Sequence, residues 1–287
     1  MGRTNVSQAG TEILVHVGVQ RAASTFLQEQ VFRIAPGIRY LGKHFDDYPD
    51  WMIAWHYTDP GRFSEQHDRI ERAVRERIDP TRLNVMSSEG FCLLGGLAPL
   101  QADRLARILP EAKILVVLRD PLERMLSLYR YAARKERWFQ PFEALIDWKE
   151  PPFVFYKRKP IYLPDYYYDE IVGAYRRLFG EGRVCVLRYE TMRHDPDAFW
   201  TSLSDFAGVS LRADPKGKVA APARNAAPAE DTMDELRREN LSRVVREAFP
   251  RASLHLPPES AAETPPISDA LRERLIDRLR GRCGGYY

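Results

Sequence analysis

The chain has 287 residues, of which 44% are hydrophobic and 29% are charged. This composition allows a substantial core beneath a charged surface and is compatible with one large domain over residues 1–287. The 43 Lys and Arg residues nearly balance 40 Asp and Glu residues, which leaves a formal charge of +3. So small an excess gives no reason to expect a nucleic-acid partner, and any anion has to be recognised by local geometry.

Three widely spaced cysteines, Cys92, Cys185 and Cys283, form no CxxC pair. This usage fits a reducing compartment, and Cys185 lies in an apolar run that predicts a core thiol. No stretch approaches the ~18 to 20 apolar residues that cross a bilayer, and the first residues lack a signal-peptide pattern. We therefore expect a cytoplasmic protein without a transmembrane segment, and the sequence leaves its oligomeric state open.

Four apolar runs in chain order predict buried strands: Ile13–Val17, Leu83–Ser87, Lys113–Leu118 and Arg183–Arg188. Helical patterns such as Glu65–Ile78 and Leu100–Leu109 lie between them. This alternation predicts an α/β fold, a parallel β-sheet flanked by helices on both faces. Ligands bind to such sheets at the carboxyl ends of the strands.

Residues 138–165 have the weakest periodicity and predict an irregular aromatic cap. The cap either floors an acceptor site or simply packs; its aromatic residues and those just after it are Trp138, Phe139, Phe142, Trp148, Phe153, Phe155, Tyr156 and Tyr166–Tyr168. Residues 215–228 predict a loop. A Pro-rich linker from about residue 257 leads to a final helix over Ser268–Arg280.

The loop after the first strand suits an anion. Small residues from Ala22 to Thr25 let the backbone approach closely, two hydroxyls can donate, and Arg21 supplies a cation. A GxxxxGK[ST] nucleotide loop is absent, which disfavours metal-dependent phosphoryl transfer, and no metal-ligand cluster is visible. The alternative is structural: Ser24 or Thr25 caps the helix and Arg21 is a surface charge.

A second basic loop follows the strand Lys113–Leu118. Arg119 sits where that strand ends, and Ser127 lies off the apolar stripe of the next helix, on the side of Arg124. A planar guanidinium and a hydroxyl suit a terminal phosphate. The alternative is that Arg119 pairs with Asp120 or Glu123 and that Ser127 is merely solvated.

Three segments, in this order and spacing, resemble the signatures of sulfotransferases that use 3′-phosphoadenosine 5′-phosphosulfate (PAPS). Gln20–Phe26 resembles the "PKSGTTW" loop, and Arg119–Tyr129 matches "RDPxxRxxSxY" without a gap. Val186–Pro196 is similar to "LxYEDLxxDP", and Phe206–Val209 to the "FLG" that follows it. The resemblance spans most of residues 12–210 and implies a P-loop-like α/β architecture that works without a metal.

The resemblance also implies roles for individual residues. The loop residues Arg21, Ala22, Ala23, Ser24, Thr25 and Phe26 would hold the 5′-phosphosulfate. Arg119 and Ser127 would hold the 3′-phosphate, and Tyr189 would lie near the adenine unless it is a core tyrosine. Arg21 stands in place of the family's lysine and Ala23 in place of its glycine. Since arginine does not give up a proton, Arg21 is expected to act by charge stabilisation.

An acceptor hydroxyl needs a general base, and the sequence offers two candidates. His44 lies in a stretch similar to the "KExHFFD" of carbohydrate sulfotransferases, but Gly42 stands where that family has its catalytic glutamate. Glu89 follows the strand Leu83–Ser87 at its carboxyl end. The structural alternatives are a surface histidine and a helix-capping glutamate.

The expected activity is therefore transfer of a sulfuryl group from PAPS, which leaves adenosine 3′,5′-bisphosphate. The acceptor would be a hydroxyl, or an amine, of a small-molecule, lipid-linked or carbohydrate partner. Two alternatives stay open: a nucleotide-binding module with impaired catalysis, and a P-loop nucleotide kinase.

Overall fold

The structure, a computed structural model, describes residues 12–42, 52, 55–56, 58–92, 98–135, 138–148, 161–212, 233–248, 267–283 and 286. The chain divides into two compact units. Unit 1 comprises Met1–Leu93, Leu97–Leu118 and Glu170–Gly217, and unit 2 comprises Leu94–Gly96, Arg119–Asp169 and Lys218–Tyr287. The single domain expected over the whole chain stays a prediction.

Unit 1 is built on a five-stranded sheet with the order β2-β3-β1-β4-β7, in which all neighbours are parallel. Its strands are β1 (Ile13–Val17), β2 (Ile38–Tyr40), β3 (Leu83–Ser88), β4 (Lys113–Leu118) and β7 (Val184–Arg188). Each predicted strand is found within one residue of its expected bounds. The predicted α/β fold with a parallel sheet is confirmed.

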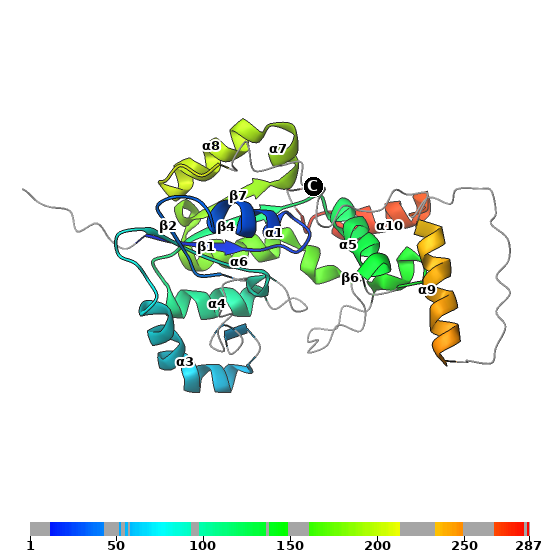
Figure 1. The fold of residues 1–287 in the computed structure, drawn as a ribbon, viewed down its shortest axis with the longest axis horizontal. Helices are drawn as coiled ribbons and strands as arrows, with labels where there is room; N and C mark the ends of the chain where they lie inside the picture. Colours follow the sequence, from blue (N-terminus) through cyan, green and yellow to red (C-terminus); the bar gives the residue numbers. More distant parts are fainter. Residues whose placement is uncertain are drawn as a thin grey trace, which may run out of the picture. The chain divides into compact units, whose positions relative to one another are not determined.

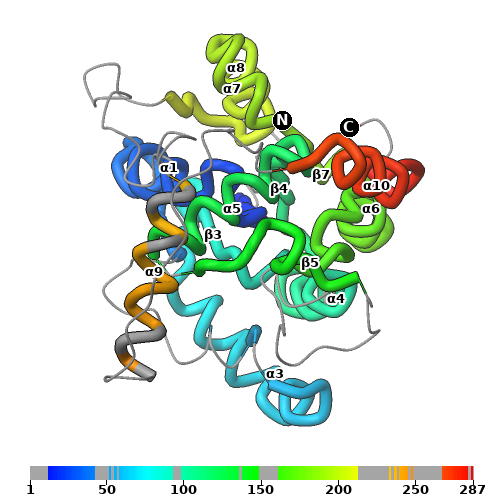
Figure 2. Tube along the Cα trace, turned by 90° about the vertical axis from the view of Figure 1, so that its right-hand side faces the viewer, coloured from blue at the N-terminus to red at the C-terminus, as the bar shows by residue number. Residues whose placement is uncertain are grey.

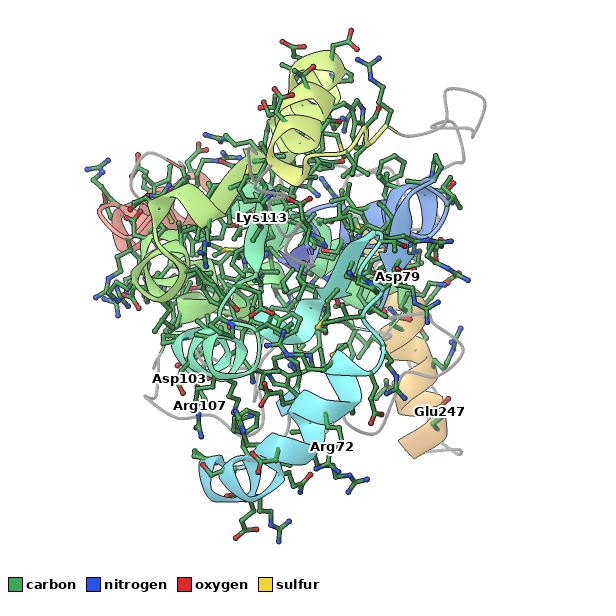
Figure 3. The ribbon with its side chains drawn as sticks, turned by 90° about the vertical axis from the view of Figure 1, so that its left-hand side faces the viewer. Arg72, Asp79, Asp103, Arg107, Lys113 and Glu247 are labelled. Carbon is green, nitrogen blue, oxygen red and sulfur yellow. The ribbon has the colours of Figure 1, made fainter. Side chains whose placement is uncertain are left out.

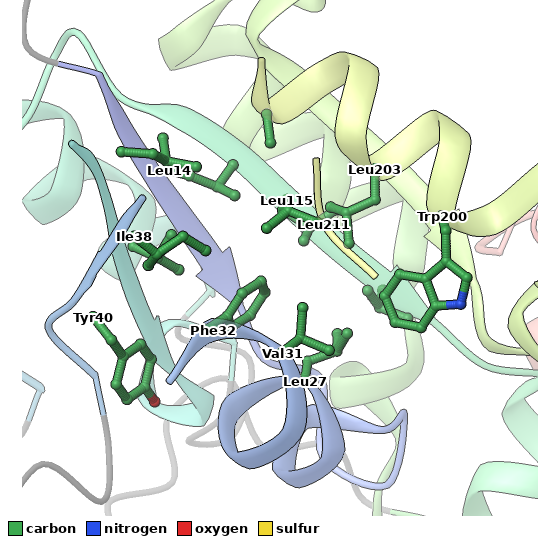
Figure 4. Packing of buried hydrophobic residues seen from close by; sticks show 14 of the residues in the cluster. Leu14, Leu27, Val31, Phe32, Ile38, Tyr40, Leu115, Trp200, Leu203 and Leu211 are labelled. Carbon is green, nitrogen blue, oxygen red and sulfur yellow. The ribbon is translucent and has the colours of Figure 1, made fainter. Parts of the chain in front are cut away.

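Helices cover both faces of this sheet (Figure 1). One face carries a hydrophobic cluster that includes Leu14, Phe32, Leu115 and Trp200 (Figure 4). The cluster joins the sheet to α1 (Ser24–Leu27), to the π-helix η1 (Gln28–Phe32) and to α8 (Pro196–Ala207). The short helix α7 (Tyr189–His194) precedes α8, and in Figures 1 and 2 both lie on the side of the sheet opposite α4 (Ala98–Ile108).

The opposite side of unit 1 is assembled around a buried arginine of α4. Arg104 is 1% exposed, donates to the carbonyls of Trp55 and Thr58 at 2.5 Å each, and stacks 4.6 Å above the Phe63 ring of α3 (Pro60–Arg75). Burial lowers the pKa of this guanidinium. Exposed charges such as Arg107 cover the outer side of α4, as Figure 3 shows.

β7 differs from its prediction as a buried strand, because it lies at the edge of the sheet. Only Val184 is fully buried there, and Cys185 is half-buried against the hydrophobic cluster. Burial raises the pKa of the Cys185 thiol to about 11. All three cysteines are free thiols, and the cytoplasmic location stays a prediction.

Unit 2 contains the expected final helix, and the irregular cap expected near residues 138–165 stays a prediction because residues 149–160 lie outside the described residues. Its elements are α5 (Pro121–Lys135), η3 (Phe142–Leu145), β5 (Ile146–Asp147), β6 (Ile161–Tyr162), η4 (Leu163–Tyr166), α9 (Met233–Ala248) and α10 (Asp269–Leu279), and α6 (Tyr168–Phe179) begins in it and runs into unit 1. The helix predicted over Ser268–Arg280 is found as α10, and the Ser268 side chain caps its N-terminus. Phe142 and Tyr166–Tyr168 are buried, whereas Phe153, Phe155 and Tyr156 lie outside the described residues.

Helix α9 was not predicted, and it packs along α5 (Figure 2). Its buried Asn240 donates to the carbonyls of Ala133, at 2.8 Å, and Trp138, at 3.1 Å. The side-chain amide thus binds carbonyls at and beyond the last turn of α5, which would otherwise lack partners. Across the part of the chain that the structure describes, no helix has the length and apolar character needed to span a membrane.

Candidate active site

The loop after β1 has a strained backbone. Arg21 (φ 67°) and Ala23 (φ 63°) are the two non-glycine residues with positive φ among those described. Side chains other than glycine adopt this left-handed conformation at a cost of ~1 to 2 kcal/mol. Alternating left- and right-handed residues turn successive backbone N–H groups toward one concave point, which is an anion-binding arrangement.

The structural alternative for this loop, a side-chain helix cap, is wrong. The N-cap residue of α1 is Ala23, whose side chain carries no acceptor. The hydroxyl of Ser24 donates to the carbonyl of Val19 at 2.9 Å and so braces the loop. The first amides of α1 therefore have no side-chain cap, and their binding of the donor's phosphosulfate stays a prediction.

Glu89 lies against the start of this loop. Gly18 donates its backbone N–H to the carbonyl of Ser88, the last residue of β3, at 3.2 Å. A Cβ atom on Gly18 would meet the Glu89 Cγ at 3.3 Å and the Ser24 hydroxyl at 3.2 Å. The carboxylate-bearing side chain and the loop thus share the carboxyl edge of the sheet, and glycine is what lets them approach.

The surroundings of Gly42 leave no room for a glutamate side chain at that position. A Cβ atom there would lie 2.4 Å from the Tyr40 hydroxyl and 2.7 Å from the carbonyl of Ser87. Since contacts under 3.0 Å are sterically forbidden, no side chain fits without rearrangement of β2 or β3. His44, the other candidate base, lies outside the described residues.

A buried polar cluster supports the loop and β3. His16 of β1 is fully buried, and its Nδ1 lies 2.7 Å from the Ser87 hydroxyl, which also accepts from Gln28 Nε2 at 3.0 Å. Burial lowers the pKa of His16 to about 3, so the ring is neutral at physiological pH. The cluster links η1 to the strand that carries Glu89.

His56 is a buried contact of the Glu89 turn that the sequence did not reveal. The turn η2 (Glu89–Phe91) is closed by Gly90 N–H donating to the Ser88 hydroxyl at 3.1 Å. A Cβ on Gly90 would lie 2.5 Å from the His56 ring, which therefore rests on the glycine backbone. Burial lowers the pKa of His56 to about 4.

In unit 2, Arg119 directly follows β4 and is mostly buried. Its Nη2 lies 3.6 Å from a carboxylate oxygen of Glu123, so one contact of the structural alternative is present. The other half of that alternative is wrong, because Ser127 is 7% exposed rather than solvated. Arg124 is 2% exposed and is packed inside the unit.

Two further candidates have mixed surroundings. Tyr189 is half-buried at the start of α7, directly after β7. Phe26 packs toward the hydrophobic cluster, with its ring 6.3 Å from that of Trp200, so its side chain serves the core. Among the described residues there is no group of three or more His, Cys, Asp or Glu side chains suited to a metal.

Unit 1 thus combines a parallel sheet with a strained loop and a nearby carboxylate at the carboxyl edge of that sheet. Residues 98–214 match the model of the Sulfotransferase family. The resemblance recognised in the sequence is thereby confirmed. The first loop and Glu89 precede the matched region, so their roles stay predictions.

One solved structure with a TM-score above 0.5 supports the fold. The chain is similar to a sulfotransferase from Alicyclobacillus acidocaldarius, with 19% identity and a TM-score of 0.52, covering 84% of this chain and 96% of that one. Weaker matches include the sulfotransferase domain from the curacin biosynthetic pathway (15% identity, TM-score 0.43, 95% and 98% covered). A mouse sulfotransferase complexed with PAP also matches (12% identity, TM-score 0.38, 86% and 86% covered). Among curated protein sequences, none matches the chain.

Proposed function

We propose that this protein transfers a sulfuryl group from PAPS to a hydroxyl or amine of a small-molecule, lipid-linked or carbohydrate acceptor, with Glu89 as the general base. The observation that carries the proposal is the contact of Glu89 with Gly18 at the mouth of the anion loop. A base must lie within reach of the acceptor atom that attacks the donor. The end of β3 is such a place.

The donor-binding roles follow the family motifs. Arg21 and the backbone amides of residues 22–25 would hold the 5′-phosphosulfate, and the positive φ values at Arg21 and Ala23 support this. Arg119 and Ser127 would hold the 3′-phosphate, and Tyr189 would border the adenine. Bound there, the donor supplies the sulfuryl group that the acceptor receives.

The protein's own contribution is positioning, charge and proton transfer. As the oxygen or nitrogen of the acceptor attacks the sulfur of the donor, Glu89 takes the proton from that attacking atom. Arg21 keeps its charge throughout and stabilises the negative charge that grows on the departing phosphate. In this proposal, positioning of the reactants and stabilisation of charge supply the rate enhancement, and no metal is assigned a role.

The variant Glu89→Gln tests the base. It keeps the shape of the side chain and removes its basicity, so turnover should fall ~100-fold or more. Binding of adenosine 3′,5′-bisphosphate should stay within twofold of the parent protein, which calorimetry measures. His44→Asn is the matched comparison: if it abolishes turnover while Glu89→Gln is fully active, the base is the histidine.

Calorimetry also tests the donor. Adenosine 3′,5′-bisphosphate should bind far better than adenosine 5′-monophosphate, with the same affinity with and without Mg²⁺, and Arg119→Ala should erase most of the preference. Loss of a desolvated charged contact is worth ~2 to 5 kcal/mol. A requirement for Mg²⁺ would instead favour the nucleotide kinase, and binding without turnover would favour the impaired module.

Arg21 is tested by turnover rather than by nucleotide affinity. Arg21→Lys should retain substantial activity because the charge remains, whereas Arg21→Ala should have very little, since the charge acts mainly in the transition state. Near-native turnover in Arg21→Ala would make the loop a purely structural element.

A further inference from the structure

Arg119 stands between two elements of known bounds, directly after β4 and two residues before the first residue of α5. The ladder between β4 and β7 ends with Leu118 opposite Arg188. The N-terminal bonds of α5 run to Asp120: its carbonyl accepts from the Arg124 N–H at 2.8 Å and its carboxylate from the Glu123 N–H at 2.9 Å. The orientation of the Arg119 backbone decides where its guanidinium can point, so a hydrogen bond to this backbone bears on how the guanidinium is placed.

A tyrosine makes such a hydrogen bond. The hydroxyl of Tyr168, at the start of α6, donates to the carbonyl oxygen of Arg119 at 2.8 Å. Tyr168 is fully buried, and this burial raises the pKa of its hydroxyl well above the ordinary value. It is thus a neutral hydrogen-bond donor throughout the physiological pH range.

Tyr168 is itself braced by the second arginine of the motif. The Arg124 guanidinium hydrogen-bonds the Tyr168 side chain and donates to the carbonyl of Asp165 at 2.7 Å. It also lies 4.2 Å from the centre of the Tyr166 ring. A buried cation with polar and aromatic partners on several sides is rigid. Arg124 lies on α5 about one turn before Ser127.

The C-terminal turn ties down the same tyrosine segment. The Cys283 thiol donates to the carbonyl of Tyr166 at 3.1 Å, and the Asp169 N–H donates to the carbonyl of Arg282 at 3.1 Å. The Arg282 guanidinium covers the ring of Tyr167 at 4.5 Å. The tyrosine that bonds Arg119 is therefore fixed by α5 and by the C-terminal turn, all within unit 2.

We propose that Tyr168, braced by Arg124, is a positioning residue that fixes Arg119 for recognition of the donor's 3′-phosphate. This inference rests on the donor assignment proposed above. In this inference Arg124 does not contact the ligand. It holds Tyr168, whose hydroxyl in turn orders Arg119.

The test is the ratio of two dissociation constants, for adenosine 5′-monophosphate and for adenosine 3′,5′-bisphosphate, measured by calorimetry. Tyr168→Phe removes one hydroxyl and should lower this ratio about fivefold, or ~1 kcal/mol, the usual contribution of one hydrogen bond. Affinity for the monophosphate should stay unchanged, because that nucleotide lacks the 3′ group. Tyr167→Phe, which deletes the neighbouring buried hydroxyl, is the matched control and should keep the parent ratio.

A double-variant cycle shows whether the tyrosine acts through the arginine. In an Arg119→Ala background, Tyr168→Phe should have no further effect on the ratio. An unchanged ratio in Tyr168→Phe, or equal weakening of both nucleotides, overturns the positioning role while leaving the donor assignment intact. A parent protein without any preference overturns the donor assignment and this inference with it. If Tyr168→Phe does not fold, Arg124→Lys replaces it: a ratio lowered to a similar extent supports the role, and an unchanged ratio overturns it.

Discussion

Two buried histidines predict a steep loss of stability in mild acid. His16 and His56 have pKa values lowered by burial to about 3 and about 4, against 6.5 for an unfolded chain. Between these limits the unfolded chain binds protons that the folded protein excludes. The stabilisation is therefore fully present above pH 6.5 and is lost as the pH falls toward the folded values.

The magnitude follows from the same values. Lowering the pH from 8 to 5 should reduce the free energy of unfolding by about 2 kcal/mol for each histidine, and by about 4 kcal/mol for the pair. Near pH 5.5 the slope should be about 2.5 kcal/mol per pH unit. The carboxylates whose pKa values are lowered, such as Asp59 and Asp79, titrate below this window and do not obscure it.

Urea unfolding followed by tryptophan fluorescence between pH 5 and 8 measures this slope. His16→Gln keeps a polar side chain beside Ser87 and should remove about half of the slope. His67→Gln is the control, because His67 is only partly buried on α3 and its ring hydrogen-bonds the exposed Asp68. A slope below about 0.7 kcal/mol per pH unit near pH 5.5 corresponds to a difference of about half a bound proton between the unfolded and native states. Such a slope would show that neither ring is buried and neutral in the native protein.

Three other substitutions test the loop and its neighbours. Ala23→Gly should raise the free energy of unfolding by ~0.5 kcal/mol by relieving the left-handed strain, whereas Ala22→Gly, at a buried position without that strain, should lower it by ~1 kcal/mol; both are measured by urea unfolding. Gly42→Ala should lower the free energy of unfolding by ~1 to 3 kcal/mol because its Cβ overlaps two atoms of the sheet region, and an unaffected variant would contradict the packing described there. Glu123→Gln should strengthen binding of adenosine 3′,5′-bisphosphate a few-fold in calorimetry by releasing Arg119, and weaker binding would argue that the carboxylate orients the arginine instead.

The sheet was predictable because its strands carry a local signal. Ile13–Val17 and Lys113–Leu118 are apolar, β-branched runs, and their ends in the structure are the predicted ones. Helix α9 was not predicted, and its contact with α5 is made partly by a buried asparagine, Asn240, whose polarity interrupts the apolar pattern that marks a packed helix face.

The site residues that directly follow a strand could be predicted from the sequence, whereas the contacts between distant segments could not. Glu89 follows a strand with clear bounds, so its place at the carboxyl edge could be foreseen. The contact of His56 with Gly90 joins residues more than thirty positions apart, and the Tyr168 bond to Arg119 joins residues nearly fifty positions apart. Such contacts depend on how helices pack, and neither spacing nor residue type reports them.

The lack of space for a side chain at Gly42 is the reason we propose a base at the end of β3 rather than at the end of β2. β2 and β3 are neighbouring parallel strands, so the residues that follow them emerge at the same edge about 5 Å apart. Tyr40 fills the space that a side chain at position 42 would need, while Gly18 opens the space that Glu89 enters. Position 42, after β2, thus has no room for a carboxylate side chain, whereas the missing side chain of Gly18 leaves room for Glu89, after β3. An acceptor deprotonated by Glu89 would have to approach sulfur from the β3 side of the loop, which makes the residues around η2 the first place to seek acceptor specificity.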